Sequence, residues 1–222
     1  GTTIPGPTRY RCGGSHGGMG SRGTDGSGGI PGPTYGSIVA PINLGSGGGQ
    51  YMGVFCGGGG AAKLAVTGST SLDGLICVDG TNDVTTANSG GAGGSVWLTT
   101  ASLSGNGRIQ ANGGAGWADG PGGGGGRISV VLTGSDSFAG IATEARGGYW
   151  NAPYSGAAGT IYLQTQSQGS GRGTLTINNA NQSANRATDI SSNVTGRAVG
   201  DVRIVGNATF QVNTNQSLTV YG

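Results

Sequence analysis

Charged residues are scarce in this sequence. They make up 9% of the 222 residues, with Lys63 as the single lysine and Glu144 as the single glutamate. Lysine and glutamate usually cover helix surfaces, and each of the 53 glycines disfavours a helix by about 1 kcal/mol relative to alanine. The composition therefore excludes a mainly helical protein and is unlike that of most cytosolic enzymes.

Long runs of one residue class are also missing. The arginines are scattered singly and the formal net charge is only +2, so we expect no DNA or RNA partner. The longest apolar stretch, around Ile128–Leu132, falls far short of the roughly 18 residues that a membrane span needs. The chain begins with neither a methionine nor a hydrophobic leader, which predicts a mature product or an excerpt of a longer protein.

An internal repeat of about 32 residues is the strongest positive signal. Alternating apolar residues, the period of a half-buried strand, recur in segments 63–67, 95–99, 127–131 and 160–164. A second strand signal follows each segment at a nearly fixed offset. Each unit ends in a glycine-rich stretch, such as 113–116 or 122–126.

The repeat predicts an all-β fold, a parallel β-helix (β-solenoid) with long glycine-rich loops. Stacked coils would bury two ladders, Leu64-Val96-Ile128-Ile161 and Val66-Leu98-Val130-Leu163. The column Ala65-Trp97-Ser129-Tyr162 would face outward. Ordering a glycine backbone costs about 1–2 kcal/mol per residue, so we expect tract 122–126 to be ordered only because it packs closely against neighbouring backbone.

Composition divides the chain into three regions. Residues 1–50, rich in Gly, Pro, Ser and Thr, predict an irregular N-terminal cap over the first coil. Residues 51–170 hold the glycine-rich solenoid. Residues 171–222 exchange glycine for asparagine and threonine, and predict either a β continuation or a small β-domain.

An ordered series of motifs runs through residues 13–133. It consists of Tyr35-Gly36-Ser37, Pro41, Leu44-Gly45-Ser46-Gly47-Gly48-Gly49, Gly93-Gly94-Ser95-Val96-Trp97-Leu98 and the tract from Gly122 to Arg127-Ile128. This series resembles the glycine-rich repeat modules of very large secreted surface and adhesin-like proteins. The resemblance implies a β-helical extracellular module within a long or polymeric protein, and it carries over no catalytic residue.

One stretch matches a catalytic motif by its letters. Gly13-Gly14-Ser15-His16-Gly17 fits GxSxG, whose serine needs a strand-to-helix turn and a separate histidine base. His16 is the only histidine and no helix is expected after it, so we predict a solvent-facing loop residue and no hydrolase. Zinc usually needs three or four ligands and Cys12 is the only soft neighbour, so we predict neither a metal site nor a cofactor.

Carboxylates give no clear catalytic pattern. Asp73, Asp79 and Asp83 lie within one unit, where they either ligate calcium or, as we favour, bond the local backbone in turns. A β-helical polysaccharide-cleaving enzyme needs a carboxylate pair, or calcium beside a basic residue. The equivalent repeat positions read Asp79, Asn112 and Arg146, so that class of enzyme is kept only as a minor alternative.

Aromatic residues gather between positions 97 and 162. Their faces suit sugar rings or protein contacts, although they could also cover glycine loops as local core. The candidate glycan or partner contacts are Trp97, Trp117, Trp150, Tyr154 and Tyr162, with Tyr149 in the same stretch. The C-terminal region adds four N-x-[ST] sequons, which are candidate glycosylation sites in a secreted eukaryotic protein: Asn181, Asn193, Asn207 and Asn215.

Three cysteines, Cys12, Cys56 and Cys77, occur without a CxxC spacing. Cys77 aligns with Gln110 and Glu144 at outward-facing positions, where it could meet either other cysteine in an oxidising compartment. We expect one disulfide involving Cys56 and one leftover thiol.

These features together predict a non-enzymatic structural module of an extracellular fibre, filament or cell-surface coat. Its partners would be further copies of itself or other segments of a longer surface protein, met through solenoid ends and glycine-rich faces. The alternative is an adhesin or glycan-binding segment that uses the surface aromatics.

Overall fold

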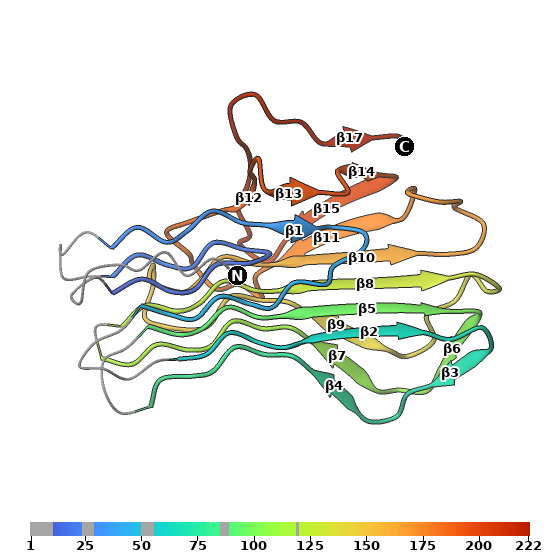
Figure 1. Ribbon diagram of the computed structural model, residues 1–222, viewed down its shortest axis with the longest axis horizontal. Coiled ribbons are helices and arrows are strands. Elements are labelled where there is room, and N and C mark those ends of the chain that lie inside the picture. Colours follow the sequence, from blue (N-terminus) through green and yellow to red (C-terminus); the bar gives the residue numbers. More distant parts are fainter. Residues whose placement is uncertain (1–10, 24–28, 50–55, 85–88, 119) are drawn as a thin grey trace.

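The computed structural model describes residues 11–23, 29–49, 56–84, 89–118 and 120–222, and within them every regular element is a β-strand. The largest sheet has the strand order β15-β11-β10-β8-β5-β2 (Figure 1). Its strands are β2 (Ala61–Ala65), β5 (Ser95–Thr100), β8 (Arg127–Leu132), β10 (Thr160–Gln164), β11 (Thr174–Asn178) and β15 (Asp201–Val205). The β10–β11 pair is antiparallel and the other pairs of this sheet are parallel.

Smaller parallel sheets surround it. On one side, β3 (Ser69–Ser71) pairs with β6 (Ser102–Ser104), and β4 (Leu75–Cys77), β7 (Arg108–Gln110) and β9 (Ala142–Glu144) form a three-stranded sheet. The remaining pairs are β1 (Gly36–Ser37) with β13 (Val194–Thr195), β12 (Thr188–Ile190) with β16 (Phe210–Val212), and β14 (Ala198–Val199) with β17 (Thr219–Val220). Residues 171–222 thus continue the main sheet through β11 and β15. The described residues contain no helix with the length and apolarity to cross a membrane.

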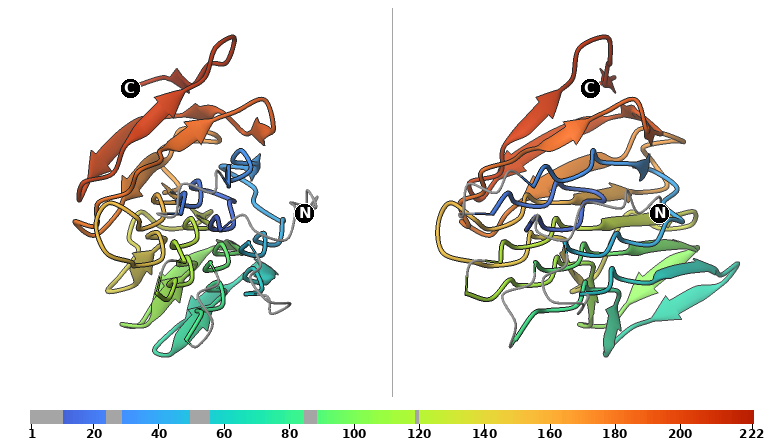
Figure 2. Two further views of the ribbon diagram at one scale, coloured as in Figure 1. Left: turned by 90° about the vertical axis from the view of Figure 1, so that its left-hand side faces the viewer. Right: turned by 60° about the vertical axis from the view of Figure 1, so that its left-hand side comes forward.

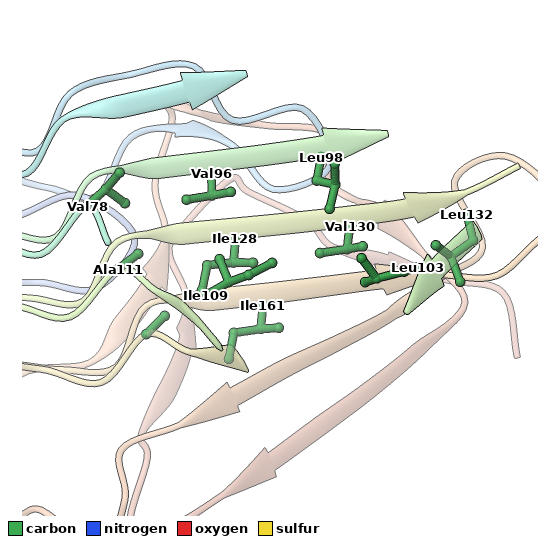
Figure 3. Close-up of a cluster of buried hydrophobic side chains, with 11 residues drawn as sticks. Val78, Val96, Leu98, Leu103, Ile109, Ala111, Ile128, Val130, Leu132 and Ile161 are labelled. Carbon is green, nitrogen blue, oxygen red and sulfur yellow. The ribbon is translucent and has the colours of Figure 1, made fainter. Parts of the chain in front are cut away.

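Consecutive repeat units pair in parallel, as the repeat predicts. Val96 of β5 lies beside Ile128 of β8, which lies beside Ile161 of β10. Val96, Leu98, Ile128 and Val130 are each at most 1% exposed. Figure 3 shows these side chains in one cluster with residues from the short strands β6 and β7.

The prediction of a parallel β-helix is nevertheless wrong. The described strands form separate small sheets that do not close into stacked coils, and the main sheet changes direction between β10 and β11. Strands take up only part of each unit. The glycine-rich remainder bonds to its equivalent in the next unit, as Gly93 does to Gly124, but it also bonds to segments that are not its equivalents: Gly91 donates to the carbonyl of Thr81 in its own unit. Backbone bonding in several directions therefore replaces the ladder of a solenoid.

The first strand is also shifted by two residues from the predicted alignment. Leu64 lies beside Leu98, and Ala62 takes the position beside Val96. The small side chains of Ala61 and Ala62 give a weak alternation signal, which is why the strand's true start is hard to see in the sequence.

The second face of the main sheet is covered too, contrary to prediction. Ser129 and Tyr162, expected outside, are 0% and 1% exposed. Residues 35–43 cross this face, and Ser129 Oγ donates to the carbonyl of Val39 at 2.7 Å. Residues 35–43 therefore cover the middle of the sheet, whereas segment 43–49 also lies against the first unit, where the amides of Gly45 and Gly48 donate to the carbonyls of Gly59 and Cys56.

Candidate functional site

Glycine-rich segments form a bundle beside the strands (Figure 1; Figure 2, left, where it faces the viewer). We call it the glycine bundle and define it by segments 12–15, 17–21, 43–49, 56–60, 78–83, 89–94, 111–116, 121–126, 145–148 and 155–159. Several of these segments are the two arms of hairpins that run out from one strand and return to the next (Figure 1). At two of the far ends the structure describes residues 117–118 and 149–154, and we call these two stretches the hairpin tips.

Segment 89–94 shows how the bundle is bonded. Its backbone amides donate hydrogen bonds of 2.8–3.3 Å to three neighbouring segments in turn, so that every third residue bonds to the same neighbour. Ser89 and Ala92 donate to segment 46–49, Gly90 and Gly93 to segment 121–124, and Gly91 and Gly94 to segment 78–81. A period of three residues without internal hydrogen bonds is that of the polyproline II helix. None of these glycines has a positive φ, in keeping with that extended form.

Three further segments donate back to the carbonyls of segment 89–94. The donors are the amides of Gly14, Gly59 and Gly114. Segment 89–94 thus has six bonded neighbours, which is the closest packing of parallel rods. Side chains have no room inside such packing: a Cβ on Gly124 would overlap the carbonyl oxygen of Gly18. The prediction that tract 122–126 is ordered and closely packed is confirmed.

The hairpin tips carry most of the predicted contact aromatics. Trp117 is 52% and Tyr149 60% exposed, whereas Trp150 and Tyr154 are half-buried. The two tips are neighbours, because the Gly122 amide donates to the carbonyl of Tyr154 at 3.1 Å. Ser155 Oγ closes the second tip by accepting from the Trp150 amide at 3.1 Å and donating to its carbonyl at 2.8 Å.

Two other predicted contacts lie away from the tips. Tyr162 is buried, with its hydroxyl donating to Gln164 Oε1 at 2.7 Å and accepting from the Gly173 amide at 2.9 Å, so it cannot contact a ligand. Trp97 is half-buried on β5, with Lys63 Nζ 4.2 Å from its ring centroid in a cation–π contact. The predicted aromatic face is therefore split, and only its tip residues stay together.

His16 is buried and does not lie in a solvent-facing loop as predicted. Its Nδ1 donates to the carbonyl of Gly93 at 2.8 Å, its ring lies 4.8 Å from that of Tyr35, and Nε2 has no hydrogen-bond partner among the described residues. Burial, reinforced by the nearby Arg127 charge, lowers the pKa of His16 to about 3. The neutral imidazole therefore joins the bundle to the covering segment. A glycine segment follows Ser15 instead of a helix, so no nucleophile elbow forms.

Arg127 is the second buried polar residue at this junction. It begins β8 at 1% exposure, and donates from Nε to the Tyr35 carbonyl at 2.8 Å and from Nη1 to Thr160 Oγ1 at 2.9 Å. Desolvation lowers its pKa to about 10, opposed by the charge of Asp189. The guanidinium thus stays charged at neutral pH and fastens the cover to the sheet.

One feature of the sequence marks this junction. In the paired strands, the positions equivalent to Arg127 hold Ala61, Ser95 and Thr160. A single arginine among small residues, at the first position of an apolar strand, indicates that the strand contacts a segment outside the repeat.

Acidic and amide side chains tie successive units together. Asp73 Oδ1 accepts the Asn106 amide at 3.0 Å, Asp79 Oδ1 the Asn112 amide at 2.6 Å, and Asn112 Oδ1 the Arg146 amide at 3.0 Å. The bonds of Asp73 and Asp79 span about one repeat, so these two side chains bond the neighbouring unit and not the local backbone as favoured above. The bonds to the Asn112 and Arg146 amides are partly buried, where an unpaired backbone group would cost free energy, whereas the bond to the Asn106 amide is exposed.

The same ladder brings two carboxylates near one amide. Asn112 Nδ2 lies 3.5 Å from Asp79 Oδ2 and 3.5 Å from Glu144 Oε2. Glu144 also pairs with Arg146 at 3.1 Å and accepts from Gln110 at 3.0 Å. The amide sits between the two acids, and the groove of about 300 Å³ beside Glu144 is lined by Arg108 and Arg146 but not by Asp79. No group of three His, Cys, Asp or Glu residues in the described chain could hold a metal ion.

The structure holds all three cysteines as free thiols and so does not contain the predicted disulfide. Cys77 is exposed beside Gln110, as its alignment predicts, and Cys12 is half-buried. Cys56 is 3% exposed, and burial with the nearby Asp83 raises its pKa to about 11. A thiol with that pKa stays protonated and unreactive near neutral pH.

The four sequon asparagines, Asn181, Asn193, Asn207 and Asn215, are all exposed. Three of them, Asn181, Asn207 and Asn215, adopt φ near +60° in turns. Asn207 Nδ2 also donates to the Asn181 carbonyl at 3.0 Å, so its amide already has a role in the fold.

A groove of about 550 Å³ lies between the N-terminal segment and the C-terminal strands and is lined by residues such as Met19, Pro31 and Gln211. Asp189 on its wall already accepts from the Thr34 amide and from Asn213 Nδ2. Comparison with known proteins adds no assignment: no family model, no curated protein and no solved structure matches the chain.

Proposed function

We propose that this protein is a non-enzymatic structural module of an extracellular fibre, filament or cell-surface coat. The observation that carries the proposal is the glycine bundle, in which segments such as 89–94 are bonded from six sides by backbone alone. Such a bundle joins neighbouring segments of the chain through backbone hydrogen bonds in place of side-chain contacts. The polar groups around it serve the fold, because the aspartates bond neighbouring units and His16 and Arg127 bond the cover.

The extracellular location has separate support. The four sequon asparagines are exposed, as glycan attachment requires. The scarcity of lysine and glutamate also fits a surface built from backbone and small polar residues.

Immunogold electron microscopy of the source cells tests the proposal. We expect label on a fibre or surface coat, with a regular axial spacing where the material is fibrous. Label confined to the cell interior would overturn the proposal, and an enzymatic activity that maps to Asp79 or Glu144 would overturn its non-enzymatic part.

A second candidate function is glycan binding by the hairpin tips. The observation in its favour is that Trp117 and Tyr149 expose about half or more of their surface on neighbouring tips. A glycan array with the full chain and with the Trp117→Ser/Tyr149→Ser double variant tests it. Binding that survives in the double variant, or no binding by the wild-type chain, would reject the tips as a sugar site.

The polysaccharide-cleaving alternative has the weakest support. Asp79 and Glu144 lie on either side of the Asn112 amide, and each is already engaged by other donors. A hydrolase needs its acid, its base and the scissile bond in one cleft.

A further inference from the structure

The end of the molecule formed by β2, β3 and β4 is open. Each of these strands lies at the edge of its sheet, and no described strand pairs with the outer side of β2. Gly60 and Val66 bond to β5, so strand alternation directs the backbone groups of Ala61, Lys63 and Ala65 to the open side. An unpaired edge of this kind is a template for another strand.

Part of the hydrophobic core is exposed to solvent at the same end. Leu64 is 38% exposed, although Leu98, its partner in the next strand, is 0% exposed. Ala62, Leu72 and Ile76 pack against the main core cluster but are only partly buried. Within the part of the chain that the structure describes, no further unit lies over these apolar side chains.

The usual protection of an edge strand is missing here. The strands β2, β3 and β4 contain one charged residue, Lys63, and its ammonium group lies over the Trp97 ring of its own sheet. The opposite edge of the main sheet differs, because β15 carries the exposed charges of Asp201 and Arg203. The two ends of the sheet are therefore not equivalent.

We propose that the open end binds the same end of a second copy of this chain, with β2 antiparallel to its counterpart about a two-fold axis. A partner must present two strand edges spaced like β2 and β4, with apolar side chains between them. The same end of a second copy presents both, because a two-fold axis relates the two ends. The new contact continues the interface that β5, β6 and β7 already make with β2, β3 and β4. This inference deepens the proposed structural function, and it names the partner.

Sedimentation equilibrium of the full chain with matched variants tests the pairing. The wild-type chain is expected at twice 21.5 kDa at micromolar concentration. Leu64→Lys should raise the dimer dissociation constant by about a hundredfold or more, because an ammonium would be buried in the new interface. Ala65→Pro should weaken it as well, since proline removes an amide from the open edge and leaves the ladder to β5 intact.

Ile204→Lys is the control for Leu64→Lys. Ile204 holds the equivalent place at the other edge, 47% exposed beside the buried Ile177, so its replacement should leave the dimer unchanged. A wild-type monomer, a concentration-dependent series of larger oligomers, or equal weakening by Ile204→Lys would overturn the two-fold pairing. A wild-type monomer found together with immunogold label on the cell surface would overturn the pairing alone and leave the structural function standing.

Discussion

The β-sheets, which we call the strand half, and the glycine bundle are stabilised in different ways. In the strand half, Val96, Leu98 and Ile128 are removed from water, and their burial supplies the stabilisation. In the bundle, stability comes from backbone hydrogen bonds in three directions and from close contact between chains without side chains. The stability of the strand half should therefore be most sensitive to the loss of buried apolar surface, and that of the bundle to side-chain atoms added at its closely packed glycines.

The largest effect is expected from adding a side chain inside the bundle. Gly124→Val would drive its Cβ into the Gly18 carbonyl, and the surrounding rods cannot move apart without losing their bonds. We expect a loss of more than about 5 kcal/mol, enough to prevent folding. Gly60→Val is the matched control, because a Cβ on Gly60 meets nothing within 4 Å. Soluble yield and the free energy of unfolding in urea measure both, and equal effects would refute the six-neighbour packing.

The next largest effect is expected from a charge in the strand core. Leu98→Asp should cost about 4 kcal/mol, because Leu98 is 0% exposed and an unpaired carboxylate would be buried. Trp97→Ser, on the other face of the same strand, should cost far less. Thermal unfolding of both variants compares them, and similar melting temperatures would contradict the assignment of the two faces.

A smaller, pH-dependent effect is expected at the junction of the two halves. The folded-state pKa of His16 is about 3, below its ordinary 6.5, so protons bind the unfolded chain more tightly. Stability should therefore fall as the pH drops from 6.5, by about 3 kcal/mol near pH 4, and level off below pH 3. Urea unfolding across this range, compared with His16→Gln, isolates the contribution of the imidazole. Parallel pH curves for the two proteins would exclude it.

The smallest effect on stability is expected at the hairpin tips. Trp117 is half exposed beyond the packed segments, so Trp117→Ser should change the free energy of unfolding by less than about 0.5 kcal/mol. Calorimetry of the variant measures this. A loss of several kcal/mol would show that the indole belongs to the core and is not free for a ligand.

The strand half was largely predictable from sequence. Alternation in segments 95–99, 127–131 and 160–164 located β5, β8 and β10, and the 32-residue step gave their parallel order. The burial of Ser129 and Tyr162 was not predictable from that alternation. It depends on residues 35–43, which lie far away in the chain and carry no repeat signal.

The glycine bundle was predictable in one respect only. A tract of glycines such as 122–126 predicts close backbone packing, because a side chain at these positions would overlap the neighbouring backbone. The choice of neighbours leaves no trace in the sequence, since Gly90, Gly91 and Gly93 look alike but bond to three different segments. A three-fold backbone period without side chains has no pattern of residue types, and the solenoid prediction failed for that reason.

The composition of the bundle has a thermal consequence. Its interior is peptide groups with little hydrocarbon, and hydrating polar groups on unfolding lowers the heat capacity change, whereas hydrating apolar surface raises it. The heat capacity of unfolding per residue should therefore fall below the usual range of about 12–15 cal/mol/K. The stability curve of such a protein is flatter than that of an ordinary globular domain, so its rigidity should change little between cold and warm surroundings.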